Sequence, residues 1–198
     1  MRLALLAVLA LLLAACFSTG TREPQRYYVL EPAAGRTTPE RVARPARLIV
    51  APTDSASFYN TQDIVYSRSP GTRAYYQFNS WTEPPGRSIH ALLVFRLQRS
   101  GAFRDVAASG SGVGGGLVLT TYVEEMYHDA AAAPGSARIT LRAELANPGQ
   151  DGLIGQRSFS RSAQAASYDA QGAVKGFAEA LGALLEEVVA WVDETAPR

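Results

Sequence analysis

The sequence predicts an α+β fold: a single domain with a largely antiparallel sheet and two amphipathic helices, preceded by a cleaved export signal. Short segments rich in β-branched and aromatic residues lie between proline and glycine residues, which is the pattern of strands. Two stretches with helical periodicity stand apart, so the strands come in groups rather than in regular alternation with helices. With 47% hydrophobic and 19% charged residues, the 198-residue chain has the composition of a globular protein.

Residues 1–15 have the layout of a signal peptide. Arg2 is followed by an apolar run from Leu3 to Ala15 that contains no charged residue. The run is shorter than the ~20 apolar residues of a membrane-spanning helix, and its charged start and small-residue exit are typical of a secretory signal. Cys16 follows directly and is the only cysteine, so it cannot form an internal disulfide. We therefore expect residues 1–15 to be removed and Cys16 to serve another purpose.

The residues LAAC (Leu13–Cys16) resemble the lipobox of bacterial lipoproteins. The resemblance implies a lipoprotein signal peptide and a diacylglycerol on the Cys16 thiol, and two or more acyl chains hold a protein firmly on a membrane. Phe17 rather than an aspartate follows, which by similarity to lipoprotein sorting in diderm bacteria implies the outer membrane, facing the periplasm. We expect residues 16–26 to hold the lipidated cysteine and a short tether: residues 17–26 are mostly polar, with glycine and proline, and span at most ~35 Å when extended.

The predicted mature chain is electrically neutral. Removal of residues 1–15 takes away Arg2 and no acidic residue, which leaves 18 basic and 18 acidic side chains. This balance lacks the basic surplus on which nucleic-acid binding depends. We therefore expect no nucleic-acid partner, and we expect residues 27–195 to form one domain.

The first half of this domain is predicted to hold strands and one helix. The β-type segments are 27–30, 47–52, 63–68 and 73–81, and the last two are joined by a proline-glycine turn typical of a hairpin. After the prolines at 84 and 85, apolar residues recur at helical spacing up to Gly101, which predicts a helix. The apolar positions of this helix are Ile89, Leu92, Leu93 and Leu97.

The second half is predicted to hold the sheet's long strands and a second helix. A short strand at 103–106 precedes longer ones at 117–128, 137–145 and 153–163. Strict alternation of apolar and polar residues over 137–145 predicts one buried and one solvated face, as in an antiparallel sheet. Asp169 can cap a helix that carries an apolar stripe and ends near Pro197.

Two motifs in the sequence contain residue types that bind phosphate or act as acid–base pairs in other proteins. Gly110, Gly112 and Gly115 match a phosphate-binding pattern, but a strand and not a helix follows, which favours a surface loop. Glu124 and Glu125 are adjacent in a strand and are expected to face opposite ways.

Neither histidine lies in a metal-binding motif. We expect His90 to play a structural role in the helix and His128 to be solvated at a strand end. No catalytic constellation is recognised, so the sequence predicts no enzyme, cofactor or metal site.

The stretch from Tyr75 to Trp81 is the candidate for partner binding. Tyr75, Tyr76, Phe78 and Trp81 crowd together just before a helix. They form either a packed corner between strand and helix or a binding face, since large aromatic residues serve both purposes. We expect Trp81 to lie in the core, and one of Tyr75 and Tyr76 to be exposed because strand neighbours face opposite ways.

Four features in the same order make the chain similar to a known family. They are YYVL (27–30), RLIVAP (47–52), the WTEP corner (81–84) before an amphipathic helix, and a C-terminal helix with Trp191. Together they resemble the ABC-type transport auxiliary lipoprotein family from about Tyr27 to Trp191. The resemblance implies an accessory of MCE-type transporters, which carry lipids between inner and outer membranes, with a docking role and no catalysis. The glycine-rich residues 110–116 depart from the shorter, more polar segment that family members often have there.

Two other functional classes stay open from the sequence. They are an anchored envelope hydrolase and a structural envelope lipoprotein. For the family interpretation, the expected partners are MCE-domain and ABC transporter components, together with the membrane that holds the lipid anchor. Assembly into a homo-oligomer is left open.

Overall fold

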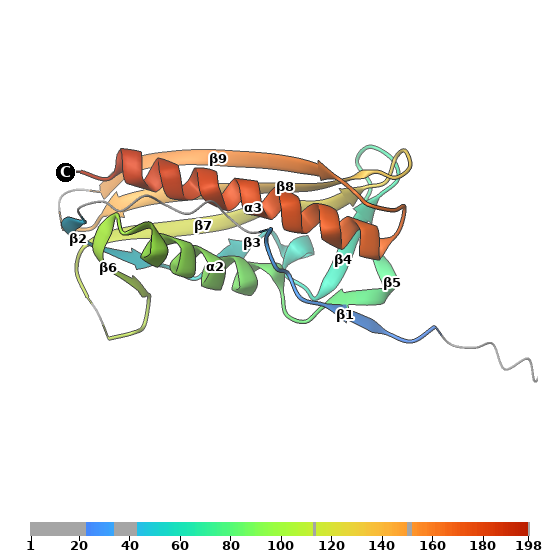
Figure 1. Ribbon diagram of the computed structural model, residues 1–198, viewed down its shortest axis with the longest axis horizontal. Helices are drawn as coiled ribbons and strands as arrows, with labels where there is room; N and C mark the ends of the chain where they lie inside the picture. Colours follow the sequence, from blue (N-terminus) through green and yellow to red (C-terminus); the bar gives the residue numbers. More distant parts are fainter. Residues whose placement is uncertain (1–22, 34–42, 113, 150–151, 198) are drawn as a thin grey trace, which may run out of the picture.

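The computed structural model describes residues 23–33, 43–112, 114–149 and 152–197 (Figure 1). The predicted signal peptide and the predicted lipidation of Cys16 lie outside these residues. None of the helices within the described ranges combines the length and the apolar character needed to cross a bilayer.

The described residues form a nine-stranded sheet and three helical elements. The strands are β1 (Arg26–Tyr28), β2 (Arg44–Val50), β3 (Asp54–Ser55), β4 (Asp63–Ser67), β5 (Ala74–Trp81), β6 (Phe103–Ala108), β7 (Leu117–Asp129), β8 (Ser136–Asn147) and β9 (Gly152–Gln164). The helical elements are η1 (Ser57–Tyr59), α2 (Pro85–Ser100) and α3 (Ala170–Thr195).

Strand β7 is the centre of the sheet. One edge of β7 pairs with β8 along its length, and β8 pairs in turn with β9; we call this the continuous edge. The other edge pairs with β2 at Leu117–Leu119, with β3 at Tyr122–Val123 and with β4 at His128–Asp129. We call this the segmented edge, because three short strands follow one another along it.

The sheet is mixed, so the prediction of a largely antiparallel sheet was wrong. Among the strands in the described ranges, three pairs are antiparallel: β4–β5, β7–β8 and β8–β9. The pairs β1–β5, β2–β6, β2–β7, β3–β7 and β4–β7 are parallel. Parallel pairing needs long return connections, and the sequence pattern shows which segments are strands without showing which distant segments meet.

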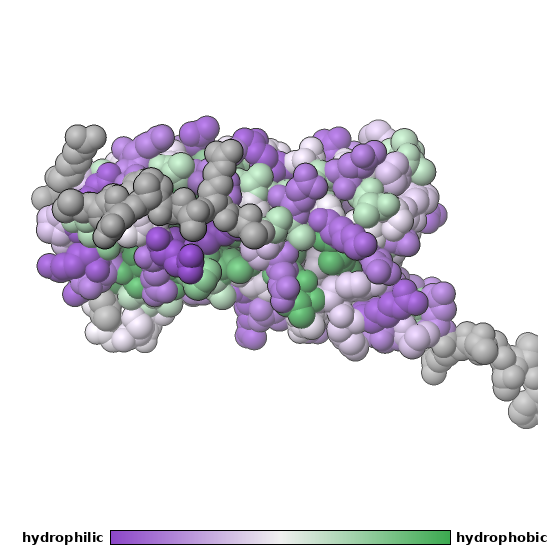
Figure 2. All heavy atoms as spheres, viewed as in Figure 1, coloured by the Kyte–Doolittle hydropathy of each residue, from purple (hydrophilic) through white to green (hydrophobic). Residues whose placement is uncertain are grey.

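Both long helices lie on one face of the sheet and enclose the core (Figure 1). Helix α3 packs mainly on β8 and β9, whereas α2 packs on β6 and β2. The alternating residues of β8 point their apolar side chains under α3, as predicted, and each is completely buried. Figure 2 shows apolar residues on the viewed face only in small patches among polar ones, which is normal for a globular surface.

Helix α3 begins where the sequence predicted. Asp169 is its N-cap and accepts a hydrogen bond from the Gly172 amide at 2.7 Å. This bond is the main cause that lowers the pKa of Asp169, since it stabilises the carboxylate form. The helix ends at Thr195, two residues before Pro197.

A short segment, Leu30–Ala33, crosses the helix layer after β1, and we call it the crossing segment. Leu30 is buried, and the Ala33 amide donates to the Ala178 carbonyl at 2.8 Å. Arg96 of α2 donates to the carbonyls of Gly182 and Ala33, at 3.0 and 3.1 Å. Burial lowers the pKa of Arg96. Arg96 thus joins α2, α3 and the crossing segment.

Candidate interaction surface

The structure distributes the four aromatic residues of the 75–81 stretch over different environments. Asp63 pairs with Ser80 and Val65 with Tyr75, so β4 advances two residues where β5 advances five. Strand β5 therefore bulges between Tyr75 and Ser80, and a bulge redirects the side chains within it. Phe78, inside the bulge, is half-buried.

Trp81 lies in the core. It is 2% exposed, and its ring packs edge-on against Phe177 of α3 with centroids 5.6 Å apart. The expected burial of Trp81 is therefore confirmed, and its side chain supports the sheet from the helix side.

Tyr76 points to His128, which is completely buried. The expectation that His128 is solvated was wrong, because Tyr168, just before α3, packs its ring edge-on against the imidazole. The Pro134 carbonyl lies 3.0 Å from His128 Nε2 and can only accept, which assigns the ring proton to Nε2. Nδ1 then accepts from the Tyr76 hydroxyl at 2.7 Å.

Burial governs the titration of this pair. It lowers the pKa of His128 because the charged imidazolium would lose its hydration, an effect that the Pro134 bond and the charges of Asp129 and Asp169 partly offset. Burial also raises the pKa of Tyr76 to about 12, and the nearby Asp169 charge adds to the shift. At neutral pH both rings are therefore uncharged.

Tyr75, in contrast, faces solvent. It is 40% exposed and stacks on Phe58 of η1, which is 37% exposed, with ring centroids 4.6 Å apart. Its hydroxyl donates to the Phe58 carbonyl at 3.2 Å. The expectation that one of Tyr75 and Tyr76 is exposed is confirmed.

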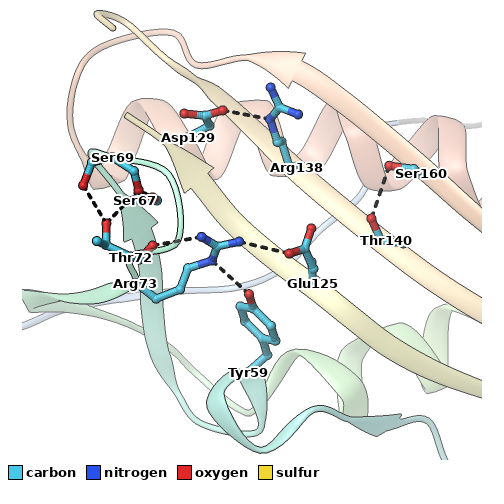
Figure 3. Close-up of polar contacts among 10 residues, drawn as sticks. All are labelled: Tyr59, Ser67, Ser69, Thr72, Arg73, Glu125, Asp129, Arg138, Thr140 and Ser160. Carbon is cyan, nitrogen blue, oxygen red and sulfur yellow. Dashed lines mark hydrogen bonds and ion pairs between the residues drawn. The ribbon is translucent and has the colours of Figure 1, made fainter. Parts of the chain in front are cut away.

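Arg73 lies next to this stacked pair and connects the β4–β5 hairpin to β7 (Figure 3). Its guanidinium donates to the Tyr59 hydroxyl and to the Glu125 carboxylate, both at 3.0 Å. It also lies over the Tyr127 ring, 3.7 Å from the centroid. Burial alone would lower the pKa of Arg73, but the Tyr59 bond and the charges of Tyr59, Tyr127 and Glu125 raise it overall.

We name these residues the η1–β5 surface: Phe58, Arg73, Tyr75, Glu125 and Tyr127. They form one contiguous group, because the Tyr59 ring contacts Phe58 and its hydroxyl binds Arg73. Sequence reasoning found only Tyr75 among them. Arg73 reaches β7 and Phe58 reaches Tyr75 only through the folding of the chain, and no spacing in the sequence indicates these contacts.

The remaining motifs have structural explanations. A bulge lies between Val123 and Glu125 in β7, so the prediction that Glu124 and Glu125 face opposite ways was wrong. Glu124 pairs with Arg142 at 3.9 Å and Glu125 with Arg73 at 3.0 Å, both on the sheet face away from the helices.

The described glycines at 110, 112 and 114–116 are exposed between β6 and β7, in line with the predicted surface loop. The His90 ring in α2 contacts the Ala51 carbonyl at 3.0 Å, in line with a structural role. Within the described ranges, no cluster of three or more histidine, aspartate and glutamate side chains is placed to hold a metal ion.

Comparison with solved structures gives the fold. A Xanthomonas campestris protein of the DUF330 family matches with a TM-score of 0.74 and 22% identity, over 86% of this chain and 96% of that chain. An uncharacterized protein matches with a TM-score of 0.67 and 19% identity, over 86% of this chain and 99% of that one. At these identities the likeness concerns the fold.

Comparison with curated proteins gives no match. The model of the family described as the ABC-type transport auxiliary lipoprotein component matches residues 28–189, which include every described strand after β1 and most of α3. The protein therefore belongs to the family of ABC-type transport auxiliary lipoprotein components.

Proposed function

We propose that the protein is a membrane-anchored periplasmic accessory of an ABC/MCE-type transport system that carries lipids between the inner and outer membranes. The observation that carries this proposal is the family match over residues 28–189, because the family is described as an auxiliary component of ABC-type transport.

The anchor in this proposal is Cys16, lipidated after removal of residues 1–15, with Phe17 directing the protein to the outer membrane. Residues 16–26 then tether a domain at 27–195 close to that membrane. Replacing Cys16 by alanine removes the only thiol that can be acylated. Radiolabelled fatty acid should enter the wild type and not Cys16→Ala, and the wild type should sediment with outer membranes. Equal labelling of both proteins overturns the anchor, and recovery in inner membranes overturns only the sorting.

The docking site in this proposal is the η1–β5 surface. Tyrosine, phenylalanine and arginine are enriched at protein interfaces, and tyrosine and arginine are among the residue types that contribute most to binding energy there. The stacking of Tyr75 on Phe58 and the bonds of Arg73 already fix these side chains, so little rotamer freedom is lost on binding. Of the four aromatic residues predicted from the sequence, Tyr75 is the one that meets a partner directly, because Tyr76 bonds His128 and Trp81 packs on Phe177 in the core.

Crosslinking and co-purification test this docking site. The double variant Phe58→Ser/Tyr75→Ser should capture MCE and ABC components at least ~10-fold less, since an interface hot spot is worth ~2 kcal/mol or more. Phe95→Ser is the matched control, because Phe95 is an aromatic residue on α2 that is 55% exposed and lies outside the surface.

The outcomes separate the parts of the proposal. If Phe58→Ser/Tyr75→Ser and Phe95→Ser capture equal amounts of MCE and ABC components, the proposed docking site is wrong, whereas the accessory function still stands. A wild-type protein that captures no such component, but turns over an ester, peptide or glycan, overturns the function itself in favour of a hydrolase. Thermal unfolding of each variant shows whether a loss of capture reflects a lost fold.

A further inference from the structure

We propose that the domain rests end-on against the lipid surface that holds its anchor, through the end at which β1 begins. This inference rests on the proposed lipidation of Cys16 and adds an orientation to it. The contacting residues, which we call the membrane-proximal end, are Tyr27, Arg68, the turn residues 131–133 and Tyr168.

The length of the tether and the place where it joins the domain favour this end. Arg26, the first residue of β1, is the tenth residue after Cys16, so the anchor lies at most ~35 Å away along an extended chain. Helix α3 has 26 residues and is ~39 Å long at 1.5 Å per residue. The tether is thus no longer than α3, so the end where β1 begins is held within ~35 Å of the anchor, which favours contact of that end with the membrane.

The residues of the membrane-proximal end are joined in space. In Figure 1 the start of β1, the β4–β5 turn, the β7–β8 turn and the start of α3 lie at one end of the molecule. The Tyr168 hydroxyl donates to the Ala130 carbonyl at 2.6 Å, and the Ala130 amide donates to the Ser67 carbonyl at 2.7 Å. The charge of Arg26 acts on the Asp169 carboxylate beside Tyr168.

The exposed side chains at this end suit the boundary between lipid headgroups and acyl chains. Tyr27 is 63% and Tyr168 46% exposed, and tyrosine concentrates at this boundary because its ring is apolar and its hydroxyl is polar. The exposed turn residues 131–133 are alanines and carry no charge. Arg68 is exposed, with its guanidinium 5.2 Å from the centroid of the Tyr66 ring, and such a side chain can reach lipid phosphates.

Two carboxylates near this end have partners within the domain, and Asp129 is neutralised by an arginine. Asp129 lies 3.0 Å from Arg138. Asp169 accepts from the Gly172 amide and from the Ser167 hydroxyl, at 2.7 and 2.8 Å.

Site-directed fluorescence on the full lipidated protein tests the orientation. Because Cys16 is the only cysteine, acylation of its thiol leaves a single introduced cysteine as the one labelling site. Ala132→Cys places a fluorophore at the membrane-proximal end. Gly114→Cys is the matched control in the exposed β6–β7 loop, where an added Cβ meets no atom within 4 Å and which lies at the opposite end in Figure 1.

The proteins are reconstituted on vesicles of phosphatidylethanolamine and phosphatidylglycerol that contain a headgroup-level quencher lipid. We expect several-fold stronger quenching of the label at position 132 than at 114. Adding Tyr27→Ser and Tyr168→Ser should lower the quenching at 132 toward the value at 114, whereas adding Phe95→Ser should not. If Tyr168→Ser unfolds the domain, the quenching measured with Tyr27→Ser alone tests the orientation. The Tyr27 side chain is mostly exposed, so its replacement should leave the fold intact.

Failure of the inference is distinguishable from failure of the anchor. Equal quenching at both positions, with the protein still on the vesicles, overturns the end-on contact and leaves the anchor intact. Shielding of position 132 only after envelope proteins are added overturns the lipid as occupant in favour of a protein. A wild-type protein that washes off the vesicles, or whose Cys16 accepts the label, overturns the proposed anchor instead.

Discussion

The two edges of β7 are stabilised in different ways. On the continuous edge, β8 follows after one short turn and pairs from Asp129↔Ser136 to Val118↔Ala146. On the segmented edge, the paired residues are far apart in sequence, from 69 residues at Leu48↔Leu117 to 62 at Tyr66↔His128. The continuous edge thus forms from local pairing, whereas the segmented edge needs distant parts of the chain to meet.

Polar side chains reinforce the segmented edge where its backbone pairing is interrupted. Thr53 bonds Thr121 through their hydroxyls at 2.7 Å, between the pairings of β2 and β3. Farther along, Arg73 binds Glu125 and Tyr76 binds His128. The η1–β5 surface lies at the gap between β3 and β4, so the interruption that weakens backbone pairing also makes room for exposed aromatic residues.

The largest expected effect comes from Trp81→Ala, which tests whether the β4–β5 branch depends on the helices. A buried large aromatic residue cut to alanine costs ~3 to 5 kcal/mol of unfolding free energy, because Trp81 loses its contact with Phe177. Tyr75→Ala, on the exposed side of the same strand, should cost no more than ~1.5 kcal/mol. Urea unfolding measures both, and equal losses would contradict the division of β5 into a buried and an exposed side.

Tyr76→Phe removes one reinforcement of the segmented edge without removing the ring. The His128 Nδ1 acceptor is then left buried and unpaired, which costs ~1 to 3 kcal/mol. Tyr66→Phe is the control, since the Tyr66 ring packs on Tyr76 in the same cluster. Hydrogen exchange should show faster opening of β4 than of β8 in Tyr76→Phe, and equal acceleration in both strands would contradict separate reinforcement of the two edges.

The pH dependence of the unfolding free energy tests the burial of His128, the partner of Tyr76. Burial lowers the pKa of His128 in the folded state, so the unfolded chain binds a proton more readily than the folded one. The contribution of neutral His128 to the free energy of unfolding is therefore complete above the pKa of ~6.5 in the unfolded chain. It is lost as the pH falls through the lower pKa of the folded protein. Urea midpoints measured from pH ~7 down to ~5 should decline in the wild type and change less in His128→Gln. Parallel declines in the two proteins would show that other groups dominate.

The smallest effect is expected for Glu125→Gln, which removes one charge from the η1–β5 surface. Partly exposed ion pairs contribute ~0.2 to 1 kcal/mol, and Glu125 lies 3.0 Å from Arg73. Glu124→Gln is the matched control, because Glu124 lies 3.9 Å from Arg142 and should contribute less. Thermal unfolding at low and high salt measures the loss of stability in each variant. A larger loss of stability in Glu124→Gln than in Glu125→Gln would contradict the role given to the Arg73 contact.

The parts of the fold that follow from local pattern could be predicted from the sequence. The strand predicted at 117–128 is observed at Leu117–Asp129, and the helix predicted after Asp169 begins at Ala170. Alternation and helical periodicity depend only on neighbouring residues, which is why these predictions were close.

The parts that depend on distant contacts could not be predicted. Strand β3 and helix η1 are too short to produce a periodic signal. The burial of His128 depends on Tyr168, and the shared face of Glu124 and Glu125 depends on a bulge. In the candidate surface, Tyr75 was predicted from aromatic crowding, but Arg73 and Glu125 meet only because the β4–β5 hairpin folds back on β7.

The crossing segment has a mechanical consequence for a domain held by its N-terminus. A pull on the tether acts along β1, whose pairing with β5 spans three residues, so these hydrogen bonds carry the load together in shear. Beyond β1, the load reaches the Ala33–Ala178 bond and the two bonds of Arg96. Force from the anchor must therefore break the β1–β5 pairing and then the bonds of the crossing segment before it reaches the core. In single-molecule pulling, Arg96→Ala should lower the force that detaches the crossing segment and leave the force that separates β1 from β5 unchanged.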